Sequence, residues 1–387
     1  MNLDELKNKT ILMLGKSRAF SSEEFLSQMK HHNIEIAKEF RDDITTVLEG
    51  RMMNPYEQNL SAELYETKKL EFVEIDLFEK HLAKTIDSDT LLMSLKLSHD
   101  KERLKSFIKN TTISDSLYLK LLKIYSWGNE DFFENDDNRD VSASFILRFY
   151  ENIERNHNVQ FSTTGFIHLV AQTKNTQLLK EISELKPLKF HPKIKTAIAM
   201  SIYSDLAMQK RFFKSDNENI LEALSVNKKL DISLVKEFLK AEKFCENIAH
   251  SITLDDELFE LLSYYKPYLA SNESLNVEMQ EKLLAMKDQQ IDLELSTNTN
   301  LDERIIKKLL AYENEEIENL IYQNSATHVS ILEEAYKDVK NHLSLAKNEN
   351  TPIDILYQLE LDSKYSRFVK KNAGYGKHIQ TNNIGWL

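Results

Sequence analysis

Apolar residues recur at helical spacing through the second half of the chain, inside a phrase that returns about every 24 residues. The phrase reads L-S-V-N-K-K-L-D at Leu224–Asp231 and L-S-T-N-T-N-L-D at Leu295–Asp302. An asparagine, replaced once by serine, marks each copy: Asn227, Ser251, Asn272, Asn298, Asn324, Asn348 and Asn372. After each of the first six markers, the residues seven, eight and eleven positions later are mostly apolar. Residues with this spacing lie on one face of a helix. Every copy therefore presents the same stripe to its neighbours, as expected for an array of repeats.

Each copy has room for one helix of three turns and a second, shorter helix. An acidic or amide residue four positions after the marker can cap the first helix, as at Asp231, Asp255, Asn276 and Asp302. The marker asparagine is predicted to close the turn between the helices through hydrogen bonds from its side chain to the backbone. We therefore expect it to have a structural rather than a catalytic role.

Residues 87–220 continue the helical pattern in a less regular form. Leu91–Asp100 is similar to the opening of a repeat, and helical stretches cover Leu117–Tyr125 and Val141–Ile153. Pro187 and Pro192 bracket a break, which is the best candidate for a hinge or bend because proline ends helices and stiffens the backbone after it.

The first 86 residues alternate between short apolar runs and helical segments. Thr10–Leu14 is typical of a buried strand, and Ser21 with the acids after it predicts a helix that runs to about His31. Further strands are expected around Ile34–Ile36, around Ile44–Leu48 and at Glu71–Ile75, with helices at Pro55–Lys69 and Asp76–Ala83. Strands alternating with helices predict a small parallel sheet with helices packed on it.

This order of elements resembles a BRCT domain of the kind appended to bacterial DNA ligases. The residues that carry the likeness are Leu6–Gly15, Ser22–Leu26, Ile44–Gly50, Asn54-Pro55 and Lys69–Phe78. The sequence departs from the family pattern in having His32-Asn33 in place of Gly-Gly and Phe78 in place of the hallmark tryptophan. The resemblance implies an α/β fold for residues 1–86.

The likeness also implies a candidate phosphate or peptide site. BRCT domains that bind phosphopeptides or 5'-phosphate DNA ends use a Ser or Thr and a Gly after the first strand, and a Lys on the second helix. Gly15 matches, and Lys16 and Ser17 lie beside it as candidate donors, but Gln58, Ser61 or Ala62 stands where the lysine belongs. The alternatives are that the domain docks an unmodified partner or caps the helical array.

The repeats of residues 221–387 resemble the variant leucine-rich repeat, an all-helical relative of armadillo and HEAT arrays. Leu343–Leu359 carries the family phrase L-A-x-N-x-x-T-P-x-x-x-L-x-x-L whole. The likeness implies an all-α solenoid whose concave face binds another macromolecule. Some members of that family carry a Cys-rich iron-sulfur segment, which this chain cannot have because it contains one cysteine, Cys245. Cys245 is expected to be a buried thiol.

Composition and charge narrow the functional classes. Glycine (7) and proline (5) are scarce, which suits a mostly helical chain. The net charge of -12 is spread along the sequence, so a general attraction to nucleic acid or to an anionic membrane is not expected. No apolar run approaches the ~20 residues that span a bilayer, and the first residues, with Asp4 and Glu5 ahead of any apolar run, are not expected to be a signal peptide. We expect a soluble cytoplasmic protein without metal or cofactor.

Two segments offer candidate partner-binding residues. The acidic stretch Trp127–Asp140 does not have the spacing of a calcium loop, so it is either a solvated loop or a docking loop for a basic partner. The anchors of a docking loop would be Trp127, Phe132 and Phe133. The stretch Lys364–His378 is expected to form one basic helix with Lys364, Arg367, Lys370 and Lys371 close to one face. That face is either merely solvated or binds a nucleic-acid backbone or an acidic partner.

The sequence predicts a BRCT-like domain followed by a helical solenoid, acting as a non-enzymatic adaptor that binds proteins. The BRCT likeness implies a DNA-repair or replication context. A protein that binds DNA through the basic C-terminal helix is the second hypothesis. An enzyme whose site is assembled from dispersed acids is the third.

Overall fold

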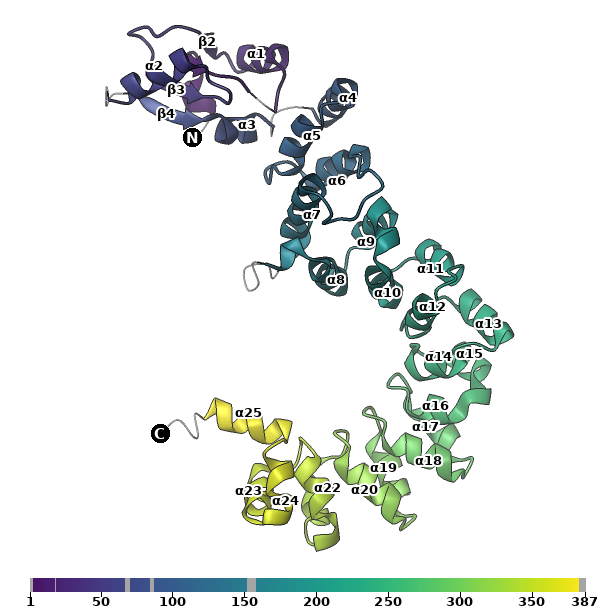
Figure 1. The fold of residues 1–387 in the computed structure, drawn as a ribbon. Coiled ribbons are helices and arrows are strands. Elements are labelled where there is room, and N and C mark those ends of the chain that lie inside the picture. The colour runs from purple at the N-terminus through teal and green to yellow at the C-terminus, as the bar shows by residue number, and fades with distance from the viewer. Residues whose placement is uncertain (1–2, 18, 67–69, 84–86, 152–157, 383–387) are drawn as a thin grey trace. The chain divides into compact units, whose positions relative to one another are not determined.

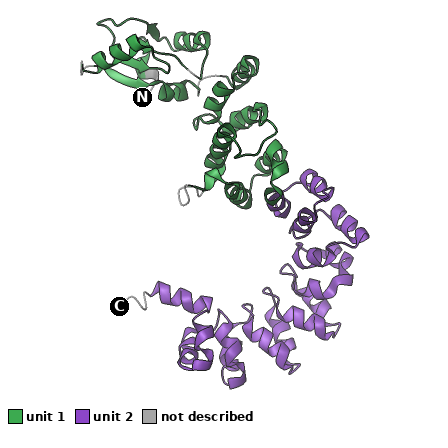
Figure 2. Cartoon of the chain, in the orientation of Figure 1, with its two compact units in different colours: residues 1–194 green, residues 195–387 purple. Residues whose placement is uncertain are grey.

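The computed structural model describes residues 3–17, 19–66, 70–83, 87–151 and 158–382 (Figure 1). The chain divides into two compact units, Met1–Ile194 and Lys195–Leu387 (Figure 2). The division falls inside helix α10 (Pro192–Met200).

Unit 1 begins with a parallel sheet whose strand order is β2-β1-β3-β4. The strands are β1 (Thr10–Leu14), β2 (Glu35–Ala37), β3 (Thr46–Glu49) and β4 (Glu71–Glu74). Leu12, in the central strand, pairs with Ala37 on one side and Val47 on the other, and it is fully buried. The small parallel sheet predicted from the alternating pattern is therefore confirmed.

Three helices belong to this sheet: α1 (Ser22–His31), α2 (Pro55–Tyr65) and α3 (Ile75–Ala83). Local sequence fixes where the first two begin, since each starts with a reciprocal capping box. Ser21 pairs with Glu24 in this way, and Asn54 pairs with Glu57. Helix α2 ends before the predicted Lys69, and residues 67–69 lie outside the described residues.

The rest of unit 1 is helical. Its helices are α4 (Ser88–Ser98), α5 (Lys101–Ile108), α6 (Asp115–Ile124), α7 (Asp136–Phe149), α8 (Thr163–Gln172) and α9 (Thr176–Glu184). Helix α7 begins before the predicted Val141 because Asn135 caps it, accepting a hydrogen bond from the backbone N–H of Asn138 at 2.8 Å. The expected break is present: Pro187 lies in a 3-10 turn and Pro192 begins α10.

Unit 2 is a succession of short helices. They are α11 (Leu206–Phe213), α12 (Glu218–Ser225), α13 (Ile232–Ala241), α14 (Cys245–Ser251), α15 (Asp256–Leu261), α16 (Lys266–Ala270), α17 (Val277–Leu284), α18 (Gln289–Ser296), α19 (Glu303–Leu310), α20 (Glu315–Gln323), α21 (Val329–Ala335), α22 (His342–Lys347), α23 (Ile353–Leu361), α24 (Ser363–Val369) and α25 (Ala373–Thr381). From α12 to α24 the even-numbered helices pack each on the next, and α13, α17, α19 and α23 pack against them (Figure 1). This arrangement is repeat-like, as the periodic phrase predicted.

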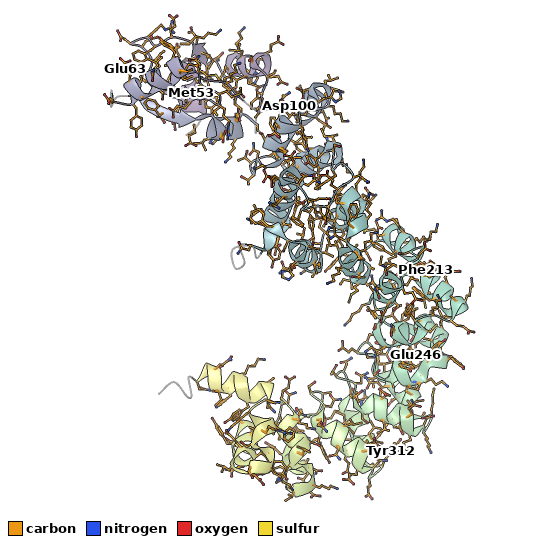
Figure 3. All side chains as sticks on the ribbon, in the orientation of Figure 1. Met53, Glu63, Asp100, Phe213, Glu246 and Tyr312 are labelled. Carbon is orange, nitrogen blue, oxygen red and sulfur yellow. The ribbon has the colours of Figure 1, made fainter. Side chains whose placement is uncertain are left out.

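The apolar stripe of each repeat forms the core of unit 2. Ile305, Ile306 and Leu309 occupy the stripe positions after Asn298, and all three are fully buried. Side chains fill the space between neighbouring helices (Figure 3). Phe213, for example, packs edge-on against Phe238 of α13, with ring centroids 4.9 Å apart. Burial of this stripe is the main force that stacks the repeats.

Candidate functional site

The marker asparagines form a buried ladder that links successive repeats. Asn298 is 1% exposed, and its side-chain Nδ2 donates to the backbone carbonyls of Ala270, at 3.0 Å, and Asn272, at 2.8 Å. Its Oδ1 accepts from the backbone N–H of Asn300 at 2.8 Å, which closes the turn between α18 and α19. The predicted turn-closing role is therefore confirmed. The bonds to the preceding repeat are an addition that the sequence did not reveal.

The same contacts recur along the array. The Nδ2 groups of three further markers donate at 2.8 Å to the carbonyl of the marker before them: Asn324 to Asn298, Asn348 to Asn324, and Asn372 to Asn348. Each of these asparagines is buried with its amide satisfied. Because their polar atoms are occupied by the backbone, the markers have no free group for chemistry.

Serine interrupts the ladder once, at Ser251. In that repeat a backbone bond joins neighbouring copies, since the N–H of Thr253 donates to the carbonyl of Lys228 at 2.8 Å. The next marker, Asn272, donates instead to the carbonyls of Ala249 and Ile252. The repeats on both sides of Ser251 are thus joined by hydrogen bonds that do not require its side chain.

A buried glutamine adds a second polar link between repeats. Gln280 occupies a stripe position otherwise held by apolar residues, eight after Asn272. Its Nε2 donates to the carbonyl of Asn300 at 2.9 Å, and its Oε1 accepts from the N–H of Asp302 at 2.9 Å. A lone glutamine in an apolar stripe was the signal that could have indicated this role.

The candidate phosphate donors Gly15, Lys16 and Ser17 lie together at the carboxyl end of β1. The N–H of Gly15 donates to Glu57 Oε1 at 3.1 Å, and the hydroxyl of Ser17 donates to Glu79 Oε1 at 2.7 Å. The Lys16 side chain is exposed. Carboxylates of this chain thus occupy two of the three donor groups that a phosphate would use.

A polar cleft of about 390 Å³ lies near this end of the sheet, where α/β proteins often bind ligands. It is lined by Arg51, Lys80, Lys105, Lys109, Ser106 and Asn110, and by Asp76, Glu79, Glu102 and Asp140. Most of its cations are paired: the Nε of Arg51 donates to Asp76 at 3.1 Å, and hydrogen bonding to Asp76 raises the pKa of Arg51. The cleft therefore carries balanced charge rather than a net preference for anions.

A buried arginine joins the α/β part of unit 1 to the helices that follow. Arg103, on α5, is 5% exposed; it donates to the carbonyl of Ala19 at 2.7 Å and forms an ion pair with Glu24. Burial acts to raise the pKa of Glu24, but hydrogen bonds from Ser94, Ser21 and Arg103 outweigh it and lower the pKa to about 2. Glu24 therefore remains ionised and holds Arg103 at the joint.

The aromatic residues of the acidic stretch lie inside unit 1. Phe132 is fully buried and stacks on Phe166, with ring centroids 4.5 Å apart. Trp127 is also buried and contacts Phe132 edge-on, whereas Phe133 is half-buried. Trp127 and Phe132 are therefore packed among α6, α7 and α8 and are not surface anchors in this structure. The many acids around them concealed this burial in the sequence.

The basic C-terminal stretch forms two helices instead of the single helix expected. Asn372, the last marker, separates α24 from α25 and caps α25. Lys364 and Arg367 lie on α24, and Lys370 and Lys371 lie in the turn after it. All four side chains are exposed, and no carboxylate among the described residues lies within ion-pair distance of them. Arg367 lies over the ring of Phe368, 4.8 Å from its centroid.

No family model, curated protein or solved structure matches this chain. Within the described ranges, no helix is long and apolar enough to span a membrane. Nor do the described side chains bring three or more histidine, cysteine, aspartate or glutamate residues together in a group that could hold a metal ion. Cys245 is a buried thiol, as expected.

Proposed function

We propose that this chain is a non-enzymatic adaptor that binds protein partners along a solenoid of variant leucine-rich helical repeats. The observation that carries the proposal is the asparagine ladder. The ladder and the apolar stripe join the repeats in series, so equivalent surface positions recur from one repeat to the next. Such a series offers an extended surface to a macromolecule. The proposal assigns no catalytic residue and no cofactor.

The α/β part of unit 1 supplies a second docking element in this proposal, and we assign it to the BRCT-like class. Support comes from the parallel sheet and from the turn at Gly15, which has a φ of +76°. The resemblance is the basis for proposing a DNA-repair or replication context for the adaptor. The backbone N–H of Gly15 donates to the carboxylate of Glu57, and the hydroxyl of Ser17 donates to the carboxylate of Glu79. Because these donors are already bound, an unmodified partner is favoured over a phosphorylated one.

Affinity purification of the full chain from its native cells, after chemical cross-linking through lysine, tests the adaptor function. We expect one or a few proteins in stoichiometric amount, with cross-links to lysines of residues 221–382. The matched control is the same purification with cross-linker added only after the cells are lysed and diluted. Repeated purifications that recover no partner, or cross-links that leave out the lysines of residues 221–382, would contradict the proposal.

Binding of DNA by the C-terminal stretch is the second candidate function, favoured by the exposed Lys364, Arg367, Lys370 and Lys371, which have no ion-pair partner among the described residues. Phosphate contacts of this kind weaken steeply as salt is raised. The chain should then bind duplex DNA at low salt, and a variant with all four residues replaced by glutamine should bind it more weakly. Undetectable binding at low salt, or binding that the replacements leave unchanged, would exclude it.

A further inference from the structure

The ion pairs between repeats stop before the end of unit 2. Earlier in the array, lysines on one repeat bind glutamates on a neighbouring repeat: Lys236 with Glu257, Lys282 with Glu260, Lys308 with Glu281, and Lys340 with Glu318, at distances of 3.0 to 3.2 Å. Ser363–Thr381, by contrast, contains five lysine or arginine residues and no aspartate or glutamate. In a chain of net charge -12, this end carries cations without partners among the described residues.

A groove of about 460 Å³ lies beside the asparagine ladder at this end. Its walls are residues that directly precede or follow the markers of four successive repeats, including Thr297, Gln323, Ser325, Lys347, Glu349 and Lys371. The buried amides of the markers are already satisfied, so the polar groups left for a ligand are those of flanking side chains such as Ser325, Glu349 and Lys371. The lining thus combines hydroxyl and amide groups with the ammonium groups of Lys347 and Lys371 and the carboxylate of Glu349.

The basic end of the groove is held in place by its neighbours. Lys347 Nζ donates to Gln323 Oε1 at 3.3 Å and lies 5.5 Å from the centroid of the Phe368 ring. Phe368 also lies beneath Arg367. Helices α22 and α24, which carry these residues, pack directly on each other (Figure 1). The cations are therefore presented from a packed surface rather than from a free tail.

We propose that this groove binds an extended, acidic segment of a protein partner, with its carboxylates at Lys347 and Lys371. This inference deepens the adaptor function and rests on it. A peptide matches the mixed lining, because its backbone N–H groups can donate to Glu349 and a backbone C=O group can accept from Ser325. A nucleic-acid backbone carries a phosphate at every unit and no N–H donor, so it offers no partner to Glu349 and matches the mixed lining less well.

Fluorescence anisotropy with the full chain tests the groove. The probe is a fluorescein-labelled peptide of alternating glutamate and serine, and a lysine-serine peptide serves as its opposite. The charge-reversed variant combines Lys347→Glu and Lys371→Glu. The matched control combines Lys180→Glu and Lys214→Glu, which changes the net charge equally at lysines outside the groove. Circular dichroism verifies that both variants keep their helical content.

The acidic probe should bind the original chain and the control variant alike, and the groove variant about tenfold or more weakly, with affinity falling as salt is raised. If both variants bound the acidic probe equally weakly, the effect would come from net charge alone, which would overturn the proposal. Absence of binding to the acidic probe would overturn it too, as would tighter binding of an oligonucleotide of the same charge.

Cross-linking purification separates the failure of this proposal from the failure of the adaptor function. If the acidic probe does not bind but the full chain still recovers a stoichiometric partner, the groove assignment fails and the adaptor function stands. If no partner is recovered, the adaptor function fails, and the groove assignment falls with it.

Discussion

The side-chain amide of Asn298 donates a hydrogen bond to the backbone carbonyl of Asn272, 2.8 Å away in the preceding repeat. The same relation holds between the later markers, so one residue type performs two tasks in each of these repeats. It closes its own turn with Oδ1 and ties that turn to the previous one with Nδ2. A buried group with several hydrogen bonds is costly to remove, because its former partners are left unpaired.

Replacing Asn298 by alanine should therefore lower the free energy of unfolding by about 3 kcal/mol, since the buried carbonyls of Ala270 and Asn272 lose their donor. Urea titration followed by circular dichroism measures the change. Thr299→Ala is the control at the neighbouring exposed position and should shift stability by less than about 0.5 kcal/mol. Equal effects of the two substitutions would show that the ladder does not stabilise the array.

Asp292, on α18, should destabilise the chain at neutral pH. The residue is 4% exposed, its Oδ1 has no hydrogen-bond partner within the described chain, and burial, with a smaller contribution from Asp288, raises its pKa. Because the folded-state pKa lies above the ordinary value of 3.8, the penalty is absent at lower pH and grows as pH rises through the folded-state pKa.

Asp292→Asn should accordingly raise stability by about 1 kcal/mol at pH 7 and have little effect at pH 3. Thermal unfolding at both pH values measures the difference. Asp216→Asn, at an exposed position, removes the same charge without relieving burial and serves as the control. A gain from Asp292→Asn that is as large at pH 3 as at pH 7 would refute this interpretation.

Arg103→Met should weaken unit 1 by about 2 kcal/mol, because the buried guanidinium binds Ala19, Ser94 and Glu24 at once. This value allows for solvent screening at Glu24, whose side chain is partly exposed. Denaturant titration of the full chain measures the loss. Arg139→Met is the control, since the Arg139 side chain is exposed and pairs with Asp136 on its own helix, at 3.2 Å.

The stability contributed by the ion pair between Glu24 and Arg103 decreases at low pH. The pKa of Glu24 is about 2 in the folded chain, below its ordinary value of 4.5, so its stabilisation is fully present above pH 4.5. It is lost as pH falls through about 2. Glu24→Gln should remove this part of the acid sensitivity, and an unchanged acid-unfolding curve would count against the joint.

Gly15→Ala should destabilise the α/β part of unit 1 by about 2 kcal/mol. Gly15 has a φ of +76°, and an added Cβ would lie 2.7 Å from the carbonyl oxygen of Arg51. Gly376→Ala is the matched control, since nothing lies within 4 Å of an added Cβ there and alanine favours the helix α25. Thermal unfolding should show a loss for the first substitution and no loss, or a small gain, for the second.

Local chemistry made several elements readable from the sequence alone. Thr10–Leu14 is a strand with the predicted bounds, and Ser21 caps α1 because its hydroxyl and the acid three residues later form a capping box. The turn at each marker was predictable for the same reason, since the Oδ1 of Asn298 reaches only two residues along the chain. Such contacts depend on short sequence distances.

The features that the sequence did not reveal depend on residues far apart in it. The carbonyl that Asn298 binds belongs to a residue 26 positions earlier. The burial of Phe132 depends on α8, and the acids beside it suggested an exposed loop instead. The break at Asn372 was overlooked because the basic residues on either side of it have helical spacing, although the marker itself predicted a turn.

The asparagine ladder also gives the array a direction. Each asparagine marker, from Asn227 to Asn372, donates hydrogen bonds from its Nδ2 to the repeat before it. Removing repeats from the C-terminal side would therefore leave both carbonyl acceptors of each remaining marker amide in place. Removing the first repeat instead would leave two buried N–H groups of the next marker without acceptors. Unpaired buried N–H groups are rarer in proteins than under-satisfied carbonyls. Loss of a repeat should therefore disturb this array less at its C-terminal end than at its N-terminal end.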